Sequence, residues 1–279
     1  MKTDEVKKVV REGYAKVAKG SGSCCGPSQA SSCCGAAPTA KEVSRRVGYS
    51  DEEMAAAPEG ANLGLGCGNP VALASLKPGE TVLDLGSGAG FDCFIAAKQV
   101  GSEGRVIGVD MTPEMLDKAR ENARKVGAAN VEFRLGEIEN LPVADNSVDA
   151  VISNCVINLA PDKRRVFGEA FRALKPGGRL MVSDLVLLAE LPTVVRDSVA
   201  AYVGCLAGAS MKADYLKAIE LAGFKDVQVK SEDPFPVELM QSDPTAQAIV
   251  KDLKVPRAEV GRIAGTIVSV KVSARKPER

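Results

Sequence analysis

Between residues 81 and 186 the chain alternates short apolar runs with longer amphipathic segments. The apolar runs are typical of strands that are buried on both faces of a sheet, and they cover 81–86, 105–110, 131–137, 148–154 and 179–186. The segments between them carry apolar residues at helical spacing and cover 91–101, 112–127 and 162–178. Strands that alternate with helices in this way predict βαβ units, and hence a Rossmann-like α/β fold whose parallel sheet has helices on both faces.

The flanking segments have different patterns. Residues 3–18 carry apolar positions at helical spacing, and "GSGSCCGPSQASSCCGAAP" at 20–38 is typical of a flexible loop. At 50–53, "SDEE" is a capping box that predicts the start of a helix. Residues 192–224 are expected to be largely helical, and "DVQVKSE" and "IVSVKVSARK" alternate with the period of edge strands. We therefore expect an N-terminal helix and cysteine-rich arm at 1–49, the sheet domain at 50–190, and a small α+β subdomain that carries the substrate lid at 191–279.

Charge and hydropathy limit the partners. Lysine and arginine number 36 and aspartate and glutamate also number 36, so the formal net charge is zero. This balance gives no electrostatic reason to expect a nucleic acid or an anionic membrane as a partner. The N-terminus is charged, and no apolar run approaches the roughly 18 residues that a membrane-spanning helix needs. We expect a cytoplasmic protein.

Histidine is absent, whereas there are eight cysteines, at 24, 25, 33, 34, 67, 93, 155 and 205. The lack of histidine excludes serine and cysteine hydrolases that use a histidine base, and zinc enzymes with histidine ligands. In a reducing cytoplasm most of the cysteines should be free thiols.

A glycine-rich turn follows the first predicted strand. In "VLDLGSGAGFD" the spacing is G-x-G-x-G, unlike the G-x-G-x-x-G of dinucleotide folds, and no lysine follows that would hold a phosphate. Asp110 ends the next strand, where its carboxylate could accept two ribose hydroxyls. A cationic ligand with a ribose and no phosphate, S-adenosylmethionine, fits better than a nucleotide, although a lone turn of this kind could be structural. Its expected binding residues lie at successive strand ends: Asp84, Gly86, Ser87, Gly88, Gly90, Asp110, Met111, Glu137, Ile138, Glu139 and Asn154.

Three cysteines fall in segments expected at the same edge of the sheet. Cys67 precedes the first strand, Cys155 follows the fourth, and Cys205 lies after the fifth. Each alone would more often be structural, but three converging thiolates suit a thiophilic ion. Trivalent arsenic on three sulfurs keeps a lone pair that can attack a sulfonium methyl group. Because no proton has to be removed, the absence of a histidine base agrees with this chemistry.

The motifs of residues 81–186 resemble those of class I S-adenosylmethionine-dependent methyltransferases, a resemblance that implies a seven-stranded sheet with strand order 3-2-1-4-5 and an antiparallel strand 7 inserted beside strand 6. "SNCVINLAPDK", "LGLGCGNP" and "GCLAG" resemble arsenite S-adenosylmethionine methyltransferases from about residue 40 onward. The resemblance implies that Cys67, Cys155 and Cys205 bind arsenite or its thiol conjugates. It also implies that an N-terminal cysteine, which we assign to Cys34, forms a disulfide with Cys67 during the cycle. Thioredoxin or glutathione would then recycle the enzyme.

Other readings stay open. The paired cysteines at 24–25 and 33–34 could form an arsenic-capturing arm, a redox pair or a zinc clip, or have no role, and Cys93 is expected to pack within a helix. The cysteines at the sheet edge would be incidental in a methyltransferase that acts on a carbon or oxygen acceptor. A protein that binds arsenite without turnover is a third possibility.

Overall fold

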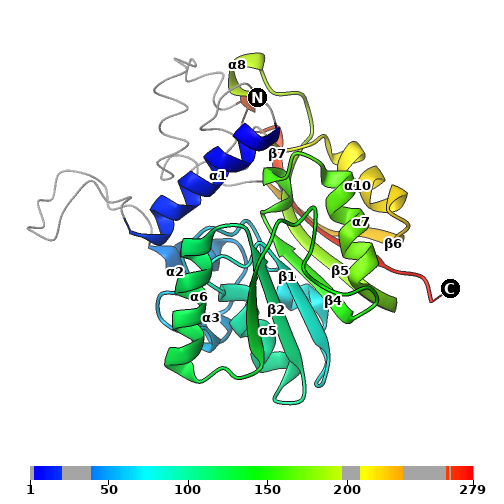
Figure 1. Cartoon of the computed structure of the whole chain (residues 1–279). Helices are drawn as coiled ribbons and strands as arrows, with labels where there is room; N and C mark the ends of the chain where they lie inside the picture. The colour runs from blue at the N-terminus through cyan, green and yellow to red at the C-terminus, as the bar shows by residue number, and fades with distance from the viewer. Residues whose placement is uncertain (1–2, 21–38, 197–207, 235–261, 264, 279) are drawn as a thin grey trace, which may run out of the picture.

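The computed structural model describes residues 3–20, 39–196, 208–234, 262–263 and 265–278. Their centre is one seven-stranded sheet in the order β3-β2-β1-β4-β5-β7-β6 (Figure 1). Strands β1 to β5 pair in parallel, and β7 lies antiparallel between β5 and β6. The strands are β1 (Thr81–Leu85), β2 (Arg105–Asp110), β3 (Val131–Leu135), β4 (Val148–Asn154), β5 (Leu174–Leu187), β6 (Lys225–Pro234) and β7 (Ile267–Arg275). The strand order implied by the class I resemblance is confirmed.

Most helices begin and end near the positions predicted from the sequence. Ser50 and Glu53 form the expected reciprocal cap, and Gly101 follows the last residue of α5. The helices are α1 (Thr3–Ala18), α2 (Ala40–Arg46), α3 (Asp51–Ala56), α4 (Pro70–Ala74), α5 (Phe91–Val100), α6 (Pro113–Val126), α7 (Lys163–Ala173), α8 (Thr193–Arg196) and α10 (Lys212–Leu221), with a 3-10 turn, η1, at Ile157–Leu159.

One predicted boundary is wrong. The helix expected over 162–178 ends at Ala173, and β5 begins at Leu174 rather than at Arg179. The reason is a register shift, because Val148 of β4 pairs with Leu174 whereas Ala150 pairs with Arg179. Pairing therefore starts before the Pro-Gly-Gly segment, which forms an irregularity inside the strand instead of a stop signal before it.

Both faces of the sheet are covered, as the continuous apolar runs predict. Along β1, Val82 packs in a cluster with α4, α5 and α6, while Leu83 and Leu85 pack in a second cluster with α7 and α10. All three side chains are fully buried. This alternation follows from the two-residue period of a strand.

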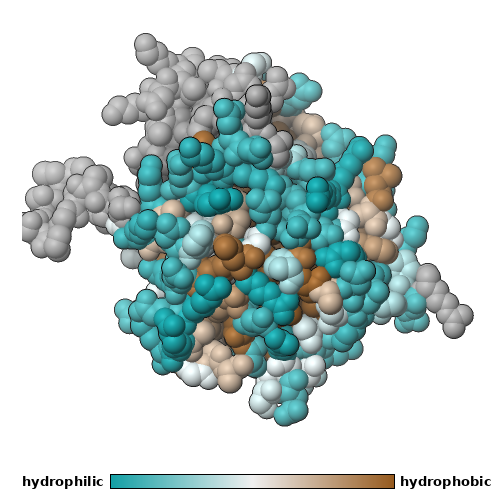
Figure 2. All heavy atoms as spheres, viewed as in Figure 1, coloured by the Kyte–Doolittle hydropathy of each residue, from teal (hydrophilic) through white to brown (hydrophobic). Residues whose placement is uncertain are grey.

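A third apolar cluster covers the carboxyl ends of the central strands. Val6 and Val10 of α1 pack there together with Cys67, Cys155 and Leu185. Helix α1 runs across this edge of the molecule in Figure 1, and apolar side chains show beneath it in the otherwise mostly hydrophilic face of Figure 2. The N-terminal helix thus covers the edge of the sheet where the sequence predicts a site.

The C-terminal strands belong to the same sheet as the central ones, since β7 pairs with β5 along nine residue pairs. The division of the chain at residues 49/50 and 190/191 stays a prediction. Helices α8 and α10 lie in the segment expected to be largely helical. Of the cysteine-rich loop expected at 20–38, residues 21–38 lie outside the described residues. Among the residues that the structure describes, no helix is both long and apolar enough to cross a membrane.

Candidate active site

The glycine-rich turn connects β1 to α5 in a conformation that needs its glycines. Gly86 has a φ of 70°, and a Cβ at this position would lie 2.3 Å from a methyl carbon of Val156. Gly88 has a φ of 52°, with open space where its Cβ would be. The backbone here can therefore approach a ligand with no side chain in between. Gly90 serves packing instead, because its Cβ would collide with Phe133.

Asp110, at the end of β2, faces this turn. Its Oδ2 accepts a hydrogen bond from the Gly88 amide at 3.0 Å, and its Oδ1 accepts one from the Thr112 amide at 2.8 Å. Burial raises the pKa of the Asp110 carboxyl, while these amides act in the opposite direction. Each carboxylate oxygen keeps a further acceptor site. The geometry leaves Asp110 free to accept ribose hydroxyls, and this role stays a prediction.

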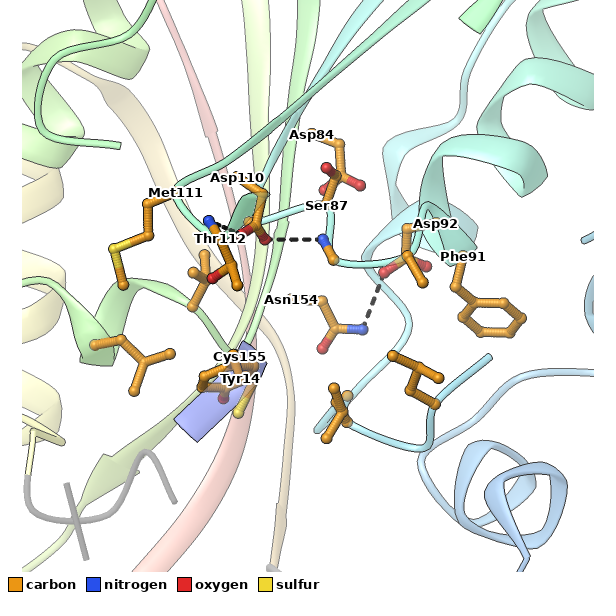
Figure 3. Close-up of a pocket in the computed structure, with 18 of the residues that line it drawn as sticks. Tyr14, Asp84, Ser87, Phe91, Asp92, Asp110, Met111, Thr112, Asn154 and Cys155 are labelled. Atoms are coloured by element: carbon orange, nitrogen blue, oxygen red, sulfur yellow. Dashed lines mark hydrogen bonds between the residues drawn. The ribbon is translucent and has the colours of Figure 1, made fainter. Parts of the chain in front are cut away.

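A cavity opens between the turn, the strand ends and α1, and it comprises about 1070 Å³ of space, part of which is open solvent. Among its lining side chains, Figure 3 shows Asp110 beside the glycine turn and Asn154 beside Asp92. Of the residues predicted to bind a donor, nine line the cavity: Asp84, Gly86, Ser87, Gly88, Asp110, Met111, Ile138, Glu139 and Asn154. Gly90 and Glu137 are not among its lining residues. The predicted strand ends therefore converge on one cavity.

Helix α1 supplies further lining residues, Lys7, Val10 and Tyr14. The Lys7 ammonium lies 2.7 Å from Glu137 Oε2 and 3.2 Å from Glu139 Oε1. Burial lowers the pKa of Lys7, but the two glutamates outweigh this effect and the net change is upward. Lys7 therefore ties α1 to the loop after β3.

Behind the turn lies a buried polar network. The Tyr49 hydroxyl donates to Asp92 Oδ1 at 2.5 Å, and the Cys93 thiol donates to Asp84 Oδ2 at 3.1 Å. Burial raises the pKa of Asp92 to about 6, and burial together with Asp92 raises that of Asp84 well above its ordinary value. Cys93 is fully buried on α5, as predicted, and its pKa is raised by burial, so it is held as a neutral thiol.

Asn154 joins this network to the segment that contains Cys67. Its Nδ2 donates to the Tyr49 hydroxyl at 2.8 Å, to Asp92 Oδ2 at 3.1 Å and to the Gly68 carbonyl at 2.8 Å. Its Oδ1 accepts from the Cys67 amide at 3.1 Å. Although Asn154 lines the cavity as predicted, its side chain is engaged mainly in holding the protein together.

Cys155 and Cys67 meet at the floor of this region. Their sulfurs and a carboxylate oxygen of Asp184 all lie within 4.8 Å of one another, and all three residues are buried. The Cys67 thiol donates to the Ser183 carbonyl at 3.6 Å, and the Cys155 amide donates to the same oxygen at 2.8 Å. Cys155 has a φ of 58°, a left-handed conformation that non-glycine residues adopt mainly where the surrounding structure imposes it. Two of the predicted thiols are therefore brought together, one of them in a strained backbone.

The sequence did not point to Asp184, Asp92, Tyr49 or Lys7. Burial raises the pKa of Asp184 to about 7, against the lowering effect of Lys163 and of the hydrogen-bond donors around the carboxyl. A single acidic residue near the end of the otherwise apolar fifth strand was the available signal for Asp184. Asn158 is a partner of this carboxyl, because its Nδ2 donates to Asp184 Oδ1 at 2.8 Å. Cys34 and Cys205 lie outside the described residues.

The site fits both groups that the sequence predicts. The cavity brings carboxylates and backbone amides to the glycine turn and the apolar side chains of Met111 and Ile138 to its other end, as a cationic nucleoside requires. The hydroxyl of Ser87 is buried at the turn with no partner among the described residues, so it is available to a ligand. Beside the cavity, paired sulfurs offer the donor atoms that trivalent arsenic prefers.

Comparison with known proteins decides the family. A family model described as a methyltransferase domain matches residues 76–223. An arsenite methyltransferase of Halobacterium salinarum is 48% identical over 281 aligned residues, which cover 99% of this chain and 68% of that protein. The chain belongs to the arsenite methyltransferase family.

Two further comparisons support the assignment to the arsenite methyltransferase family. The human arsenite methyltransferase is 44% identical over 137 residues, 46% of this chain and 36% of that protein. The crystal structure of an arsenic(III) S-adenosylmethionine methyltransferase from Chlamydomonas reinhardtii superposes with a TM-score of 0.60 at 34% identity, over 86% of this chain and 74% of that one. The predicted class I fold, with S-adenosylmethionine as its cofactor, is thereby confirmed.

Proposed function

We propose that this protein transfers a methyl group from S-adenosylmethionine to trivalent arsenic that is held by Cys67, Cys155 and Cys205. The observation that supports the proposal is the position of the Cys67 and Cys155 sulfurs, which lie within 4.8 Å of each other beside the donor cavity. Cys155 itself lines that cavity, so arsenic on its sulfur would face the bound donor. Cys205 is included as the third arsenic ligand because of the family resemblance.

The described residues would hold the donor by its two ends. The Gly86–Gly88 turn and Asp84 would accommodate the amino-acid part, Asp110 would accept the ribose hydroxyls, and Met111 and Ile138 would contact the adenine. When bound, S-adenosylmethionine supplies an electrophilic methyl group on a positively charged sulfur. The carboxylates that line the cavity favour this positive charge.

The arsenic lone pair is the nucleophile, so no side chain has to act as a base. Formation of the arsenic–carbon bond raises arsenic from the trivalent to the pentavalent state. Its return to the trivalent state takes two electrons, which two cysteine thiols provide when they form a disulfide. By the family resemblance these are Cys34 and Cys67, and thioredoxin or glutathione in a reducing cytoplasm would return them to thiols.

Serine replacements test the proposal. Cys67→Ser, Cys155→Ser and Cys205→Ser proteins are incubated with arsenite, S-adenosylmethionine and a thiol reductant, and arsenic species are separated and counted by mass. Each replacement should lower arsenite methylation by at least about 100-fold, because a hydroxyl is a poor ligand for a thiophilic ion. Cys93→Ser, which removes a buried thiol elsewhere, should leave the amount of bound arsenic unchanged. Full methylation by the Cys155→Ser protein would refute the mechanism.

A further inference from the structure

The donor cavity is lined by more acidic than basic side chains. Its acidic lining residues are Asp84, Asp92, Asp110 and Glu139. Among the described residues that line it, Lys7 is the one basic residue, and its ammonium lies against Glu137 and Glu139. The hydrogen bonds that the structure shows to the three aspartates come from uncharged hydroxyl, thiol and amide groups. A cationic ligand would supply the charge that balances them.

The carboxyl group of Asp92 is held from two sides. Its Oδ1 accepts from the Tyr49 hydroxyl at 2.5 Å, and its Oδ2 accepts from Asn154 Nδ2 at 3.1 Å (Figure 3). Both donors are uncharged, so they orient the carboxylate and leave its charge in place, and each oxygen keeps a further acceptor site. Asn154 directly precedes Cys155, which also lines the cavity. Asp92 therefore reaches the end of the cavity where methyl transfer would occur.

Asp92 and Asp84 act on each other within this cavity. Burial raises the pKa of Asp92 to about 6, and burial together with the nearby Asp92 raises the pKa of Asp84 well above its ordinary value. The acidic Glu53 of α3 also raises the pKa of Asp92, while its hydrogen bonds from Tyr49 and Asn154 lower it. Carboxyl groups that oppose each other's ionisation favour a ligand that brings positive charge.

The methyl donor and its product differ in that charge. S-adenosylmethionine carries a carboxylate, an ammonium and a sulfonium, so one positive charge remains uncompensated. S-adenosylhomocysteine keeps the carboxylate and the ammonium, but its sulfur is neutral. Apart from one methyl group the two molecules are otherwise the same, so a negative group in the cavity can separate their affinities through the charge on sulfur.

We propose that Asp92 is a specificity-determining residue, whose carboxylate makes the cavity bind S-adenosylmethionine more tightly than S-adenosylhomocysteine. This inference deepens the proposed function and rests on it for the place of the donor. Tyr49 and Asn154 orient the carboxylate, which attracts the sulfonium of the donor. Once the methyl group has been transferred, the sulfur is neutral and this attraction ends. The product then leaves the cavity more readily than the donor does.

Calorimetry tests this discrimination. The full-length natural protein and Asp92→Asn are titrated with each of the two ligands at pH 8, where the Asp92 carboxyl is ionised, and without arsenic, so that no turnover occurs. The ratio of the dissociation constant of S-adenosylhomocysteine to that of S-adenosylmethionine should fall about ten-fold in Asp92→Asn, as for the loss of one nearby charge. An unchanged ratio would overturn the inference, because a purely structural defect weakens both ligands alike.

Two control variants separate the charge of Asp92 from its surroundings. Tyr49→Phe removes a donor to Asp92 but keeps the carboxylate, so its ratio should stay within about two-fold of the natural one. Asp117→Asn removes a negative charge from an exposed position on α6, outside the cavity, and its ratio should not change. A ten-fold fall in Asp117→Asn as well would overturn the inference, because the net charge of the protein would then set the ratio.

A second ligand keeps the test decisive if Asp92→Asn fails to fold. Sinefungin carries an amino group in place of the methylsulfonium group, so it brings a positive charge to the same position. The natural protein should bind sinefungin more tightly than S-adenosylhomocysteine, and equal or weaker binding would overturn the inference. Full arsenite methylation by Cys155→Ser would instead refute the proposed function. Inactive cysteine variants together with an unchanged ratio in Asp92→Asn would refute the role of Asp92 alone.

Discussion

The side chain of Asn154 holds the backbone at both ends of the Cys67–Gly68 pair. Its Oδ1 accepts from the Cys67 amide at 3.1 Å and its Nδ2 donates to the Gly68 carbonyl at 2.8 Å. Because Cys155 is the next residue along the chain, the same backbone that presents one thiol also positions the other. The two thiol segments are thus coupled through the Asn154 side chain as well as through the Ser183 carbonyl, to which both cysteines donate.

Replacement of Asn154 should separate thiol positioning from donor binding. In Asn154→Asp an oxygen replaces Nδ2 opposite the Gly68 carbonyl and the Asp92 carboxylate, and the repulsion should displace the Cys67 segment. We expect KM for arsenite to rise about ten-fold, with a smaller change in the dissociation constant for S-adenosylhomocysteine measured by calorimetry. Asn140→Ala, an exposed position, is the control. A larger loss of donor binding than of arsenite binding would contradict this role.

The left-handed backbone of Cys155 predicts an unusual order of stabilities. At a φ of 58° glycine is less strained than alanine, so Cys155→Gly should be more stable to urea than Cys155→Ala by about 1 kcal/mol. At Cys93, inside α5, the order should reverse by a similar amount, because glycine is the poorer helix former. Equilibrium urea unfolding of the four variants measures both differences. The same order at the two positions would show that Cys155 is not strained.

Lys7 should support donor binding from outside the sheet domain. Lys7→Met removes the cation between Glu137 and the buried Glu139, so α1 should cover the cavity less often. We expect S-adenosylmethionine to bind about five-fold more weakly, as for the loss of a partly exposed ion pair and its packing. Lys8→Met, one position along on the exposed face of α1, is the matched control. If calorimetry gave equal affinities for S-adenosylmethionine in the two variants, the predicted role of Lys7 in donor binding would be wrong.

Asp92 should make stability fall as the pH rises. Its pKa is about 6 in the folded protein against an ordinary value of 3.8, so the folded state binds more protons between these values. The stability that this carboxyl contributes is present below about pH 4 and is lost as the pH rises through about 6. Asp92→Asn does not titrate, so its unfolding free energy relative to the natural protein should improve by about 1 kcal/mol between pH 5 and pH 8. Urea unfolding at several pH values measures the difference, and a flat or opposite trend would contradict the raised pKa.

The strands of the sheet could be predicted because each leaves a local pattern in the sequence, and their order could be predicted from the resemblance to class I methyltransferases. The buried runs around Leu83, the turn at Gly86 and the acid at Asp110 each leave a mark within a few residues of sequence. For Cys67 and Cys155, the sequence could place the two segments at the same edge of the sheet. It could not predict that both residues would donate to one carbonyl, because no local pattern specifies such a contact.

The missed residues have a common physical reason. Asp184 is a single acid near the apolar end of β5, and its place in the site comes from Asn158, Tyr215 and two thiols that reach it from three other segments. Likewise, the predicted end of the helix beyond Ala173 was wrong because the start of β5 depends on its pairing with β4. Tertiary pairing outweighed the local Pro-Gly-Gly signal.

The hydroxyl of Ser269 on β7 donates to the carbonyl of Cys67 at 2.7 Å, across 202 positions of sequence. During synthesis on the ribosome, β7 therefore emerges long after the glycine turn and both thiols have left the exit tunnel. It must then insert between β5 and β6, which cannot form their native neighbours before it arrives. A nascent chain can thus form the glycine turn and both thiol segments first, and the hydrogen bond that fixes the Cys67 carbonyl forms only after β7 has been made.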